Sequence, residues 1–131
     1  TCVLCKRLML RVAGRLAEAE GADAIITGDA IGEQASQTLK NMRAIDDALT
    51  RLPVLRPLLC YDKDETVKLA TRIGTYEISA RPDGGCKAVP KRPTTAARPE
   101  AVEEAEAALD VETLVEAALA GAKKVPLERV A

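Results

Sequence analysis

The stretch ADAIITGDAIGEQASQT, residues 22–38, joins an apolar run, a turn with two glycines and a polar helix start. Its first part, ADAIITG, predicts a short buried strand over residues 22–28 that ends in a glycine turn. Ser36, Gln37 and Thr38 then stand where a helix begins. Ligands of open α/β sheets bind beyond the carboxyl ends of strands, and helix N-termini favour phosphate. The stretch therefore predicts a nucleotide-binding edge, although it contains no Walker or dinucleotide fingerprint.

The sequence on either side of this stretch predicts helices and a second strand. Apolar residues at helical spacing predict a first helix that ends at Gly21. A second helix begins after residue 38 and stops before Pro53. VLRPLLC, residues 54–60, predicts the second strand, and its Pro57 favours a strand end or the edge of a sheet.

Beyond the second strand the sequence predicts further helices around one loop. Asp62, three residues before Glu65, forms a capping-box pattern, and the helix that it starts ends at Gly74. Residues 79–98 contain prolines and a glycine pair, which predicts a loop. The two C-terminal helices are predicted over residues 99–109 and 111–120.

The alternation of helices and strands predicts the fold class. We expect a three-layer α/β fold with a parallel sheet and C-terminal helices. Strands near residues 23–28 and 54–59 should be parallel neighbours, or lie one strand apart, because the helix between them suits a right-handed crossover. Two strands make a poor sheet, so either the chain oligomerises or the rest of the sheet lies outside this sequence. We favour the second explanation.

Composition narrows the class of protein. The 131 residues carry a net charge of −1 and are 47% hydrophobic and 30% charged, which is typical of one soluble globular domain. No apolar run approaches the roughly 18 residues of a membrane span, so we expect a cytoplasmic protein without a membrane partner. The net charge does not predict nucleic-acid binding by the chain as a whole. Basic residues nevertheless gather in the first helix and after Cys86, and acidic residues follow residue 99.

Cysteines are the candidate chemical groups. The chain has four of them and no histidine, so any thiolate site must use cysteine alone. The pair Cys2 and Cys5 at a helix start suits a metal ion, a cluster iron or a redox pair. Cys86, in the cation-rich loop DGGCKAVPKRP, suits a reactive thiolate or a ligand. These three would leave a fourth ligand position open, which is typical of chemistry rather than of structural zinc. Cys60 ends an apolar strand and is expected to be a buried core thiol.

Three stretches carry a resemblance to a known family, namely CKRLMLRVAGRLAEAEGADAIITGDAIGEQASQTLKNMRAID, VLRPLLCYDKDETVKLATRIGTYEIS and CKAVPKRPTT. Together they resemble the C-terminal half of the ThiI family, which comprises tRNA 4-thiouridine synthetases, some of which also serve thiamine biosynthesis. The resemblance extends over about residues 2–109. It implies that residues 1–97 form the C-terminal half of a PP-loop ATP pyrophosphatase domain, of the adenine nucleotide alpha-hydrolase-like fold. Residues 98–131 would be a helical extension of that domain.

The resemblance also implies site residues. Lys6, Gly28 and Gln37 match the family's contacts to ATP, which would be bound with Mg2+, and Cys86 matches the cysteine that takes part in sulfur transfer. The chain departs from the family at Asp29, where glutamate is usual, and the glutamine usual after Gly32 is also replaced.

In members that lack a C-terminal rhodanese domain, the CxxC pair and the sulfur-transfer cysteine are associated with an iron–sulfur cluster. The resemblance therefore implies Cys2, Cys5 and Cys86 as ligands of a cluster. Its open fourth position could hold an inorganic sulfide.

The function implied is that of an ATP-dependent tRNA uridine thiolase, in which uridine is adenylated and persulfide sulfur then displaces AMP. A role in sulfur supply for the thiamine thiazole stays open. The family's phosphate-binding SGGxDS loop and RNA-binding modules belong before Thr1. We therefore expect the isolated chain to be inactive, and to need the N-terminal half of the enzyme, tRNA and a sulfur donor protein or sulfide. We also expect a homo-oligomer.

A function of a different class stays open beside this one. The chain could be a non-catalytic domain with cysteine-ligated zinc or an iron–sulfur centre, serving structure or assembly. Zinc bound by all four cysteines, Cys60 included, would favour that reading.

Overall fold

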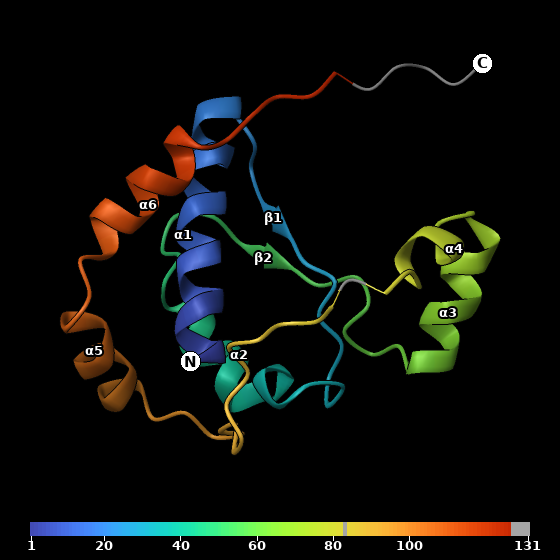
Figure 1. The fold of residues 1–131 in the computed structure, drawn as a ribbon, viewed down its shortest axis with the longest axis horizontal. Coiled ribbons are helices and arrows are strands. Elements are labelled where there is room, and N and C mark those ends of the chain that lie inside the picture. Colours follow the sequence, from blue (N-terminus) through green and yellow to red (C-terminus); the bar gives the residue numbers. More distant parts are fainter. Residues whose placement is uncertain (83, 127–131) are drawn as a thin grey trace.

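A computed structural model describes residues 1–82 and 84–126. Two short parallel strands lie at its centre, with helices packed beside them and a helical pair set apart (Figure 1). This confirms the α/β class and the parallel sheet. None of the described helices is long and apolar enough to cross a membrane.

The sheet consists of β1 (Ile25–Ile26) and β2 (Val54–Leu55). They pair in parallel, with Ile25 opposite Val54 and Ile26 opposite Leu55, so the predicted pairing is confirmed. Both strands are shorter than predicted. Backbone pairing continues irregularly beyond them, since the Ile31 N–H donates to the carbonyl of Leu59 over 3.0 Å.

The first helix, α1 (Cys2–Glu20), begins at the CxxC pair and ends at Gly21, as predicted. Gly21 has φ 68°, a left-handed conformation that glycine adopts without the steric cost of a Cβ atom. The connection between the strands contains the 3-10 helix η1 (Ala35–Gln37) and then α2 (Leu39–Asp46). α2 is shorter than predicted, and its N-cap is Thr38, whose side chain accepts a hydrogen bond from the backbone of Asn41.

The core lies on one face of the sheet. Ile25 and Val54 pack against buried residues of α1, α2 and the C-terminal part. Ile26 and Leu55 point to the opposite face, because successive side chains of a strand alternate, and they are 69% and 49% exposed. The described helices therefore cover one face and leave an apolar strip on the other. The buried members of the core are Val3, Leu10, Ala44, Ile45 and Val102.

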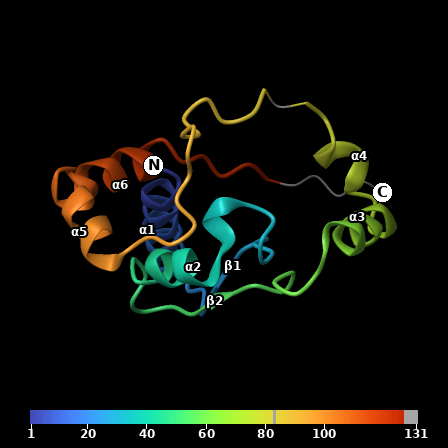
Figure 2. The same cartoon turned by 90° about the horizontal axis from the view of Figure 1, so that it is seen from below.

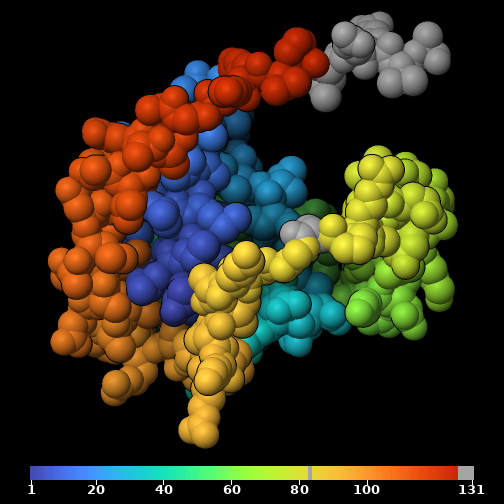
Figure 3. Space-filling view, viewed as in Figure 1, coloured from blue at the N-terminus to red at the C-terminus, as the bar shows by residue number. Residues whose placement is uncertain are grey.

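The helices α3 (Lys63–Arg72) and α4 (Tyr76–Ser79) form the separate pair, which Figure 3 shows as a lobe beside the main body. The capping box of Asp62 and Glu65 is present, as predicted, and neither helix contains a buried residue. The short helix α4 was not predicted.

The C-terminal helices α5 (Pro99–Ala107) and α6 (Val111–Ala120) lie along α1, close to their predicted positions (Figure 1). The boundary expected between residues 97 and 98 stays a prediction. Glu106 of α5 binds the buried Arg7 and also Arg11, at distances between 2.5 and 3.0 Å. The Arg7 hydrogen bonds, together with the charges of both guanidiniums and against the effect of burial, lower the pKa of Glu106 to about 2.

Candidate functional site

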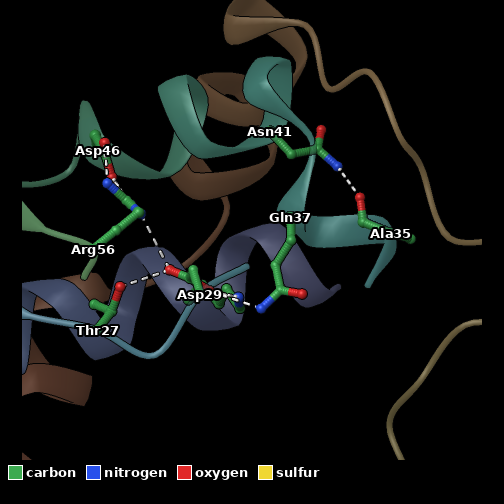
Figure 4. Close-up of polar contacts among 8 residues, drawn as sticks. Thr27, Asp29, Ala35, Gln37, Asn41, Asp46 and Arg56 are labelled. Atoms are coloured by element: carbon green, nitrogen blue, oxygen red, sulfur yellow. Dashed lines mark hydrogen bonds and ion pairs between the residues drawn. The ribbon is translucent and has the colours of Figure 1, made fainter. Parts of the chain in front are cut away.

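A carboxylate at the carboxyl end of β1 is the centre of the candidate site. Asp29 Oδ1 accepts hydrogen bonds from Lys6 Nζ at 2.6 Å and from Gln37 Nε2 at 3.2 Å. Asp29 Oδ2 accepts from Thr27 Oγ1 at 2.8 Å and from Arg56 Nε at 3.3 Å. Figure 4 shows the Thr27, Gln37 and Arg56 side chains directed at this carboxylate. Asp29 thus joins residues of α1, η1 and the segments that follow both strands.

The Arg56 guanidinium is held from two sides. Its Nη1 donates to Asp46 Oδ2 at 2.9 Å, and Nη2 bonds the other Asp46 oxygen, so the pair is bidentate (Figure 4). The Arg56 side chain is only 9% exposed. Hydrogen bonding to Asp46, followed by the charges of Asp46 and Asp29, raises the pKa of Arg56 despite burial. Asp46 at the end of α2 therefore fixes the guanidinium that faces Asp29.

Asp29 is an anion at neutral pH. Burial acts to raise its pKa, but hydrogen bonds from Lys6, Thr27 and Gln37, with the charge of Lys6, lower the pKa to about 2. The carboxylate already accepts four donors, so its acceptor sites are filled. Asp29 therefore does not fit a Mg2+ ligand in this arrangement, and its hydrogen bonds orient the cations and the amide around it.

A cavity of about 230 Å³ opens beside the carboxylate. Gly28 lies on its wall, and a Cβ atom built there would meet nothing within 4 Å. Gln37 is buried nearby, and among the described residues its Oε1 has no hydrogen-bond partner. A buried acceptor without a partner is costly, which favours a ligand donor at this point. The cavity is lined by Lys6, Met9, Leu10, Thr27, Gly28, Asp29, Ile45 and Arg56.

The predicted nucleotide contacts are brought together. Lys6 and Gly28 line one cavity, and Gln37 donates a hydrogen bond to Asp29, which lines the same cavity. From the sequence, Asp29 stood out only as a departure from the family, and Arg56 was not predicted as a site residue. A signal for Arg56 was present, because it follows β2 as Thr27 follows β1, and parallel strands end at the same edge of a sheet.

The predicted cysteine ligands are not brought together. Cys2 and Cys5 lie three residues apart in the first turn of α1, and all four cysteines are free thiols. Across residues 1–82 and 84–126, no three Cys, Asp or Glu side chains are grouped closely enough to hold a metal ion. This placement does not fit a cluster on Cys2, Cys5 and Cys86, whose role as ligands stays a prediction.

The expectation that Cys60 is a buried core thiol is wrong. Cys60 is exposed, because β2 ends at Leu55 and residues 57–60 form a turn instead of a continued strand. Pro57 contributes, since it has no N–H to donate to a strand ladder.

The segment that follows Cys86 returns to the start of α1 (Figures 1 and 2). Thr94 and Ala97 line a cavity of about 300 Å³ together with Thr1 and Leu4. Asn41, which is completely buried, holds this segment by hydrogen bonds to its backbone. Its Nδ2 donates to the carbonyl of Thr94 at 2.8 Å, and its Oδ1 accepts from the Ala97 N–H at 2.7 Å.

Comparison with known proteins shows which family this chain resembles. Residues 1–111 match the family model described as Thiamine biosynthesis protein (ThiI). The chain belongs to the ThiI family. Among curated ThiI-like relatives, a probable tRNA sulfurtransferase of Methanosarcina mazei is 45% identical over 97% of this chain and 31% of its own length. One of Thermus thermophilus, with the same name, is 51% identical over 89% of this chain and 29% of its own length.

A solved structure supports the family assignment in three dimensions. It is described as a crystal structure of a 4-thiouridine synthetase–RNA complex with bound ATP, and it matches with a TM-score of 0.84 and 42% identity. The match covers 92% of this chain and 32% of the synthetase chain. This ThiI-family chain therefore spans about a third of the length of the relatives that it matches.

Proposed function

We propose that this chain supplies the C-terminal part of the active site of an ATP-dependent tRNA uridine thiolase. Its relatives are named probable tRNA sulfurtransferases, and its structural neighbour is described as a 4-thiouridine synthetase with RNA and ATP. The observation that carries the proposal is the gathering of Lys6, Gly28 and Gln37 around Asp29. These are the residues at which the family resemblance expects ATP contacts.

In this proposal the residues around Asp29 bind and orient ATP, which supplies the adenylyl group that activates uridine. The Lys6 ammonium, 30% exposed in its side chain, is held beside the cavity by Asp29 and can attract an anionic phosphate. Gln37 Oε1, which has no hydrogen-bond partner among the described residues, would accept from the nucleotide once its side chain turned towards the cavity. Gly28 leaves room for close approach, because no side chain projects from it.

Cys86 is proposed as the thiol that carries sulfur. It is exposed, and it begins a segment in which Lys87, Lys91 and Arg92 follow and no acidic residue occurs before Glu100. Its exposure leaves the sulfur atom accessible to a sulfur donor. The same persulfide chemistry would serve thiamine thiazole sulfur supply, in keeping with the description of the family model.

The proposed iron–sulfur cluster requires a change in the position of the loop that carries Cys86. Cys2, Cys5 and Cys86 would hold an iron–sulfur cluster only if the loop of Cys86 shifted relative to α1, so no step is assigned to a cluster. Iron content of the anaerobically reconstituted full-length protein tests this assignment. Cys2→Ala, Cys5→Ala and Cys86→Ala should each abolish iron binding, and Cys60→Ala should not.

The central test separates the two half-reactions in the full-length protein that contains this chain. Pyrophosphate release in the presence of tRNA reports adenylation, and nucleoside analysis of the tRNA reports 4-thiouridine. Lys6→Met should reduce both, by about 100-fold, because a charged contact to the nucleotide is lost. Cys86→Ser should retain pyrophosphate release and lose thiolation.

Matched controls are available for both substitutions. Lys123→Met removes an exposed lysine near the C-terminus, and Cys60→Ser removes an exposed thiol, and both should leave the two readouts unchanged. Unchanged pyrophosphate release in Lys6→Met would refute the assignment of the nucleotide site. Full thiolation by Cys86→Ser would refute the role of Cys86.

A further inference from the structure

A second cavity, of about 320 Å³, lies between α2 and the segment that leads into α5. Figure 2 shows that segment running alongside α2 before α5 begins. Three of the residues that line the cavity are cationic, and none of the described lining residues is acidic. The lining consists of Lys40, Arg43, Ala44, Ala96, Ala97, Arg98 and Pro99.

These three cations differ from the arginines that bind Glu106 and Asp46. Arg7, Arg11 and Arg56 each bind a carboxylate at close range. Lys40, Arg43 and Arg98, in contrast, form no ion pair within the part of the chain that the structure describes. The cations that do form ion pairs among the described residues are Lys6, Arg7, Arg11, Arg15, Arg51, Arg56 and Lys124.

The local lack of carboxylates is not a consequence of composition. The chain has 20 acidic residues against 19 basic ones. Lys40 and Arg43 are three residues apart and therefore neighbours on the surface of α2. Like charges placed together without a carboxylate repel each other, and an anion in the cavity would relieve that repulsion.

Hydrogen bonds from Thr38 and Asn41 hold the two sides of the cavity together. Asn41, which stands between the two α2 cations in the sequence, is 0% exposed and bonds the backbone of Thr94 and Ala97. Thr38 Oγ1 donates to the carbonyl of Thr95 at 2.6 Å. These bonds fix the backbone that leads to Arg98 beside α2. The three cations thus belong to a rigid arrangement of two segments about 57 residues apart in sequence.

We propose that this cavity binds phosphate groups of the RNA backbone. The inference rests on the proposed function, and it assigns to the chain a contact surface for tRNA that is separate from the nucleotide site. Arginine and lysine bind phosphate oxygens by charge-assisted hydrogen bonds, which position a nucleic acid without reading its sequence. Lys87, Lys91 and Arg92, in the loop that precedes the cavity segment, extend the basic character along the chain.

The lining residues distinguish this cavity from the nucleotide site and from a protein-docking groove. It shares no lining residue with the cavity beside Asp29, and α2 contributes Ile45 to one and Ala44 to the other. Protein interfaces depend on large aromatic or aliphatic anchors in pockets. Here the apolar lining is alanine and proline, which provides no such anchor. A repeating phosphate backbone matches three unpaired cations better.

The test measures tRNA affinity of the full-length protein as a function of KCl concentration, for wild type and for the variant Lys40→Ala/Arg43→Ala/Arg98→Ala. Each phosphate contact contributes about 0.7 to 0.9 to the slope of log K against log salt. The triple variant should lose about tenfold or more in affinity, and its salt slope should become shallower by about two to three. All three side chains are exposed, so the fold should survive their truncation.

The charge-matched control is Arg51→Ala/Lys123→Ala/Lys124→Ala, which removes three exposed cations elsewhere on the chain. It should keep the wild-type affinity and slope. ATP affinity, measured by calorimetry, should be the same in both triple variants. Addition of inorganic phosphate tests the source of the ligand, because free phosphate at millimolar concentration should not displace tRNA if the site engages a backbone held at several points.

The outcomes are distinct. An unchanged salt slope in the cavity variant, or a loss of ATP affinity equal to the loss of tRNA affinity, would overturn the proposal. Efficient displacement by free phosphate would show a simple anion site and would also overturn it. Failure of the proposed function would look different: the wild-type protein itself would neither bind tRNA nor form 4-thiouridine.

Discussion

The Asp29 carboxylate lies 2.6 Å from the Lys6 ammonium, and this ion pair joins the carboxyl end of β1 to the first helical turns of α1. The same turns carry Cys2 and Cys5. Asp29 therefore links the proposed nucleotide site to the segment that bears the cysteine pair. A substitution at Asp29 should affect the site through the orientation of its neighbours.

Asp29→Asn should lower adenylation strongly. The amide can accept hydrogen bonds through one oxygen only, and its NH2 group would face donors that now bind a carboxylate. We expect a loss of about 1–3 kcal/mol in the free energy of unfolding and a higher KM for ATP. Asp29→Glu keeps the charge and should retain more activity, and Asp23→Asn, at an exposed position, is the control. Equal kinetics for Asp29→Asn and wild type would contradict the assigned role.

Gly28→Ala should reduce ATP binding without reducing stability. A Cβ atom at Gly28 meets nothing within 4 Å, and its backbone conformation is one that alanine accepts. Gly32 has φ 81°, so Gly32→Ala should destabilise the protein by about 1 kcal/mol through strain. Thermal melting and ATP titration of the two variants make the comparison. Normal ATP affinity in Gly28→Ala would mean that the nucleotide does not approach Gly28 closely.

Stability should fall in acid partly through Glu106. Its pKa is lowered from 4.5 to about 2 in the folded chain, so the unfolded chain takes up a proton at higher pH. The stabilisation is therefore fully present above about pH 4.5 and is lost as the pH falls towards 2. Glu106→Gln should show a weaker decline of Tm over this range. It should also cost about 3 kcal/mol at neutral pH, because Arg7 stays buried without its carboxylate.

Glu104→Gln provides the control for the acid experiment, since Glu104 is an exposed residue of the same helix. It should follow the wild-type pH profile. Asp29, whose pKa is also lowered to about 2, contributes to the decline that remains in Glu106→Gln. Identical pH profiles for wild type and Glu106→Gln would show that the Glu106 contacts do not stabilise the fold.

Asn41→Ala should loosen the segment that follows Cys86. The substitution removes the acceptor of the Ala97 N–H and the donor to the carbonyl of Thr94, and it leaves these part-buried backbone groups without their Asn41 partner. Hydrogen exchange at Ala97 should accelerate, and unfolding should become easier by about 2–4 kcal/mol.

Asn41→Asp separates the loss of the hydrogen-bond donor from the loss of the acceptor. The carboxylate keeps an acceptor for Ala97 but cannot donate to Thr94 or Ala35. Ala97 should then stay protected while 4-thiouridine formation falls. Unchanged exchange at Ala97 in Asn41→Ala would show that the segment is held by other contacts.

Much of the secondary structure could be predicted from the sequence because its signals are local. The end of α1 at Gly21 and the capping box of Asp62 and Glu65 depend on residues within one helical turn. The parallel pairing of the strands followed from the handedness of the crossover between them. The strand lengths and the exposure of Cys60 could not be predicted, since both depend on where the chain leaves the sheet.

The sequence by itself determined the order of helices and strands and the residue types at the proposed nucleotide edge, because each depends on spacing within a few residues. The tertiary structure alone decided which side chains meet. Lys6 reaches Asp29 across 23 residues, Arg56 reaches it across 27, and Asn41 holds Thr94 across 53. Such contacts arise from the packing of α1 and α2 on one face of the sheet, and burial then gives each hydrogen bond and charge its strength.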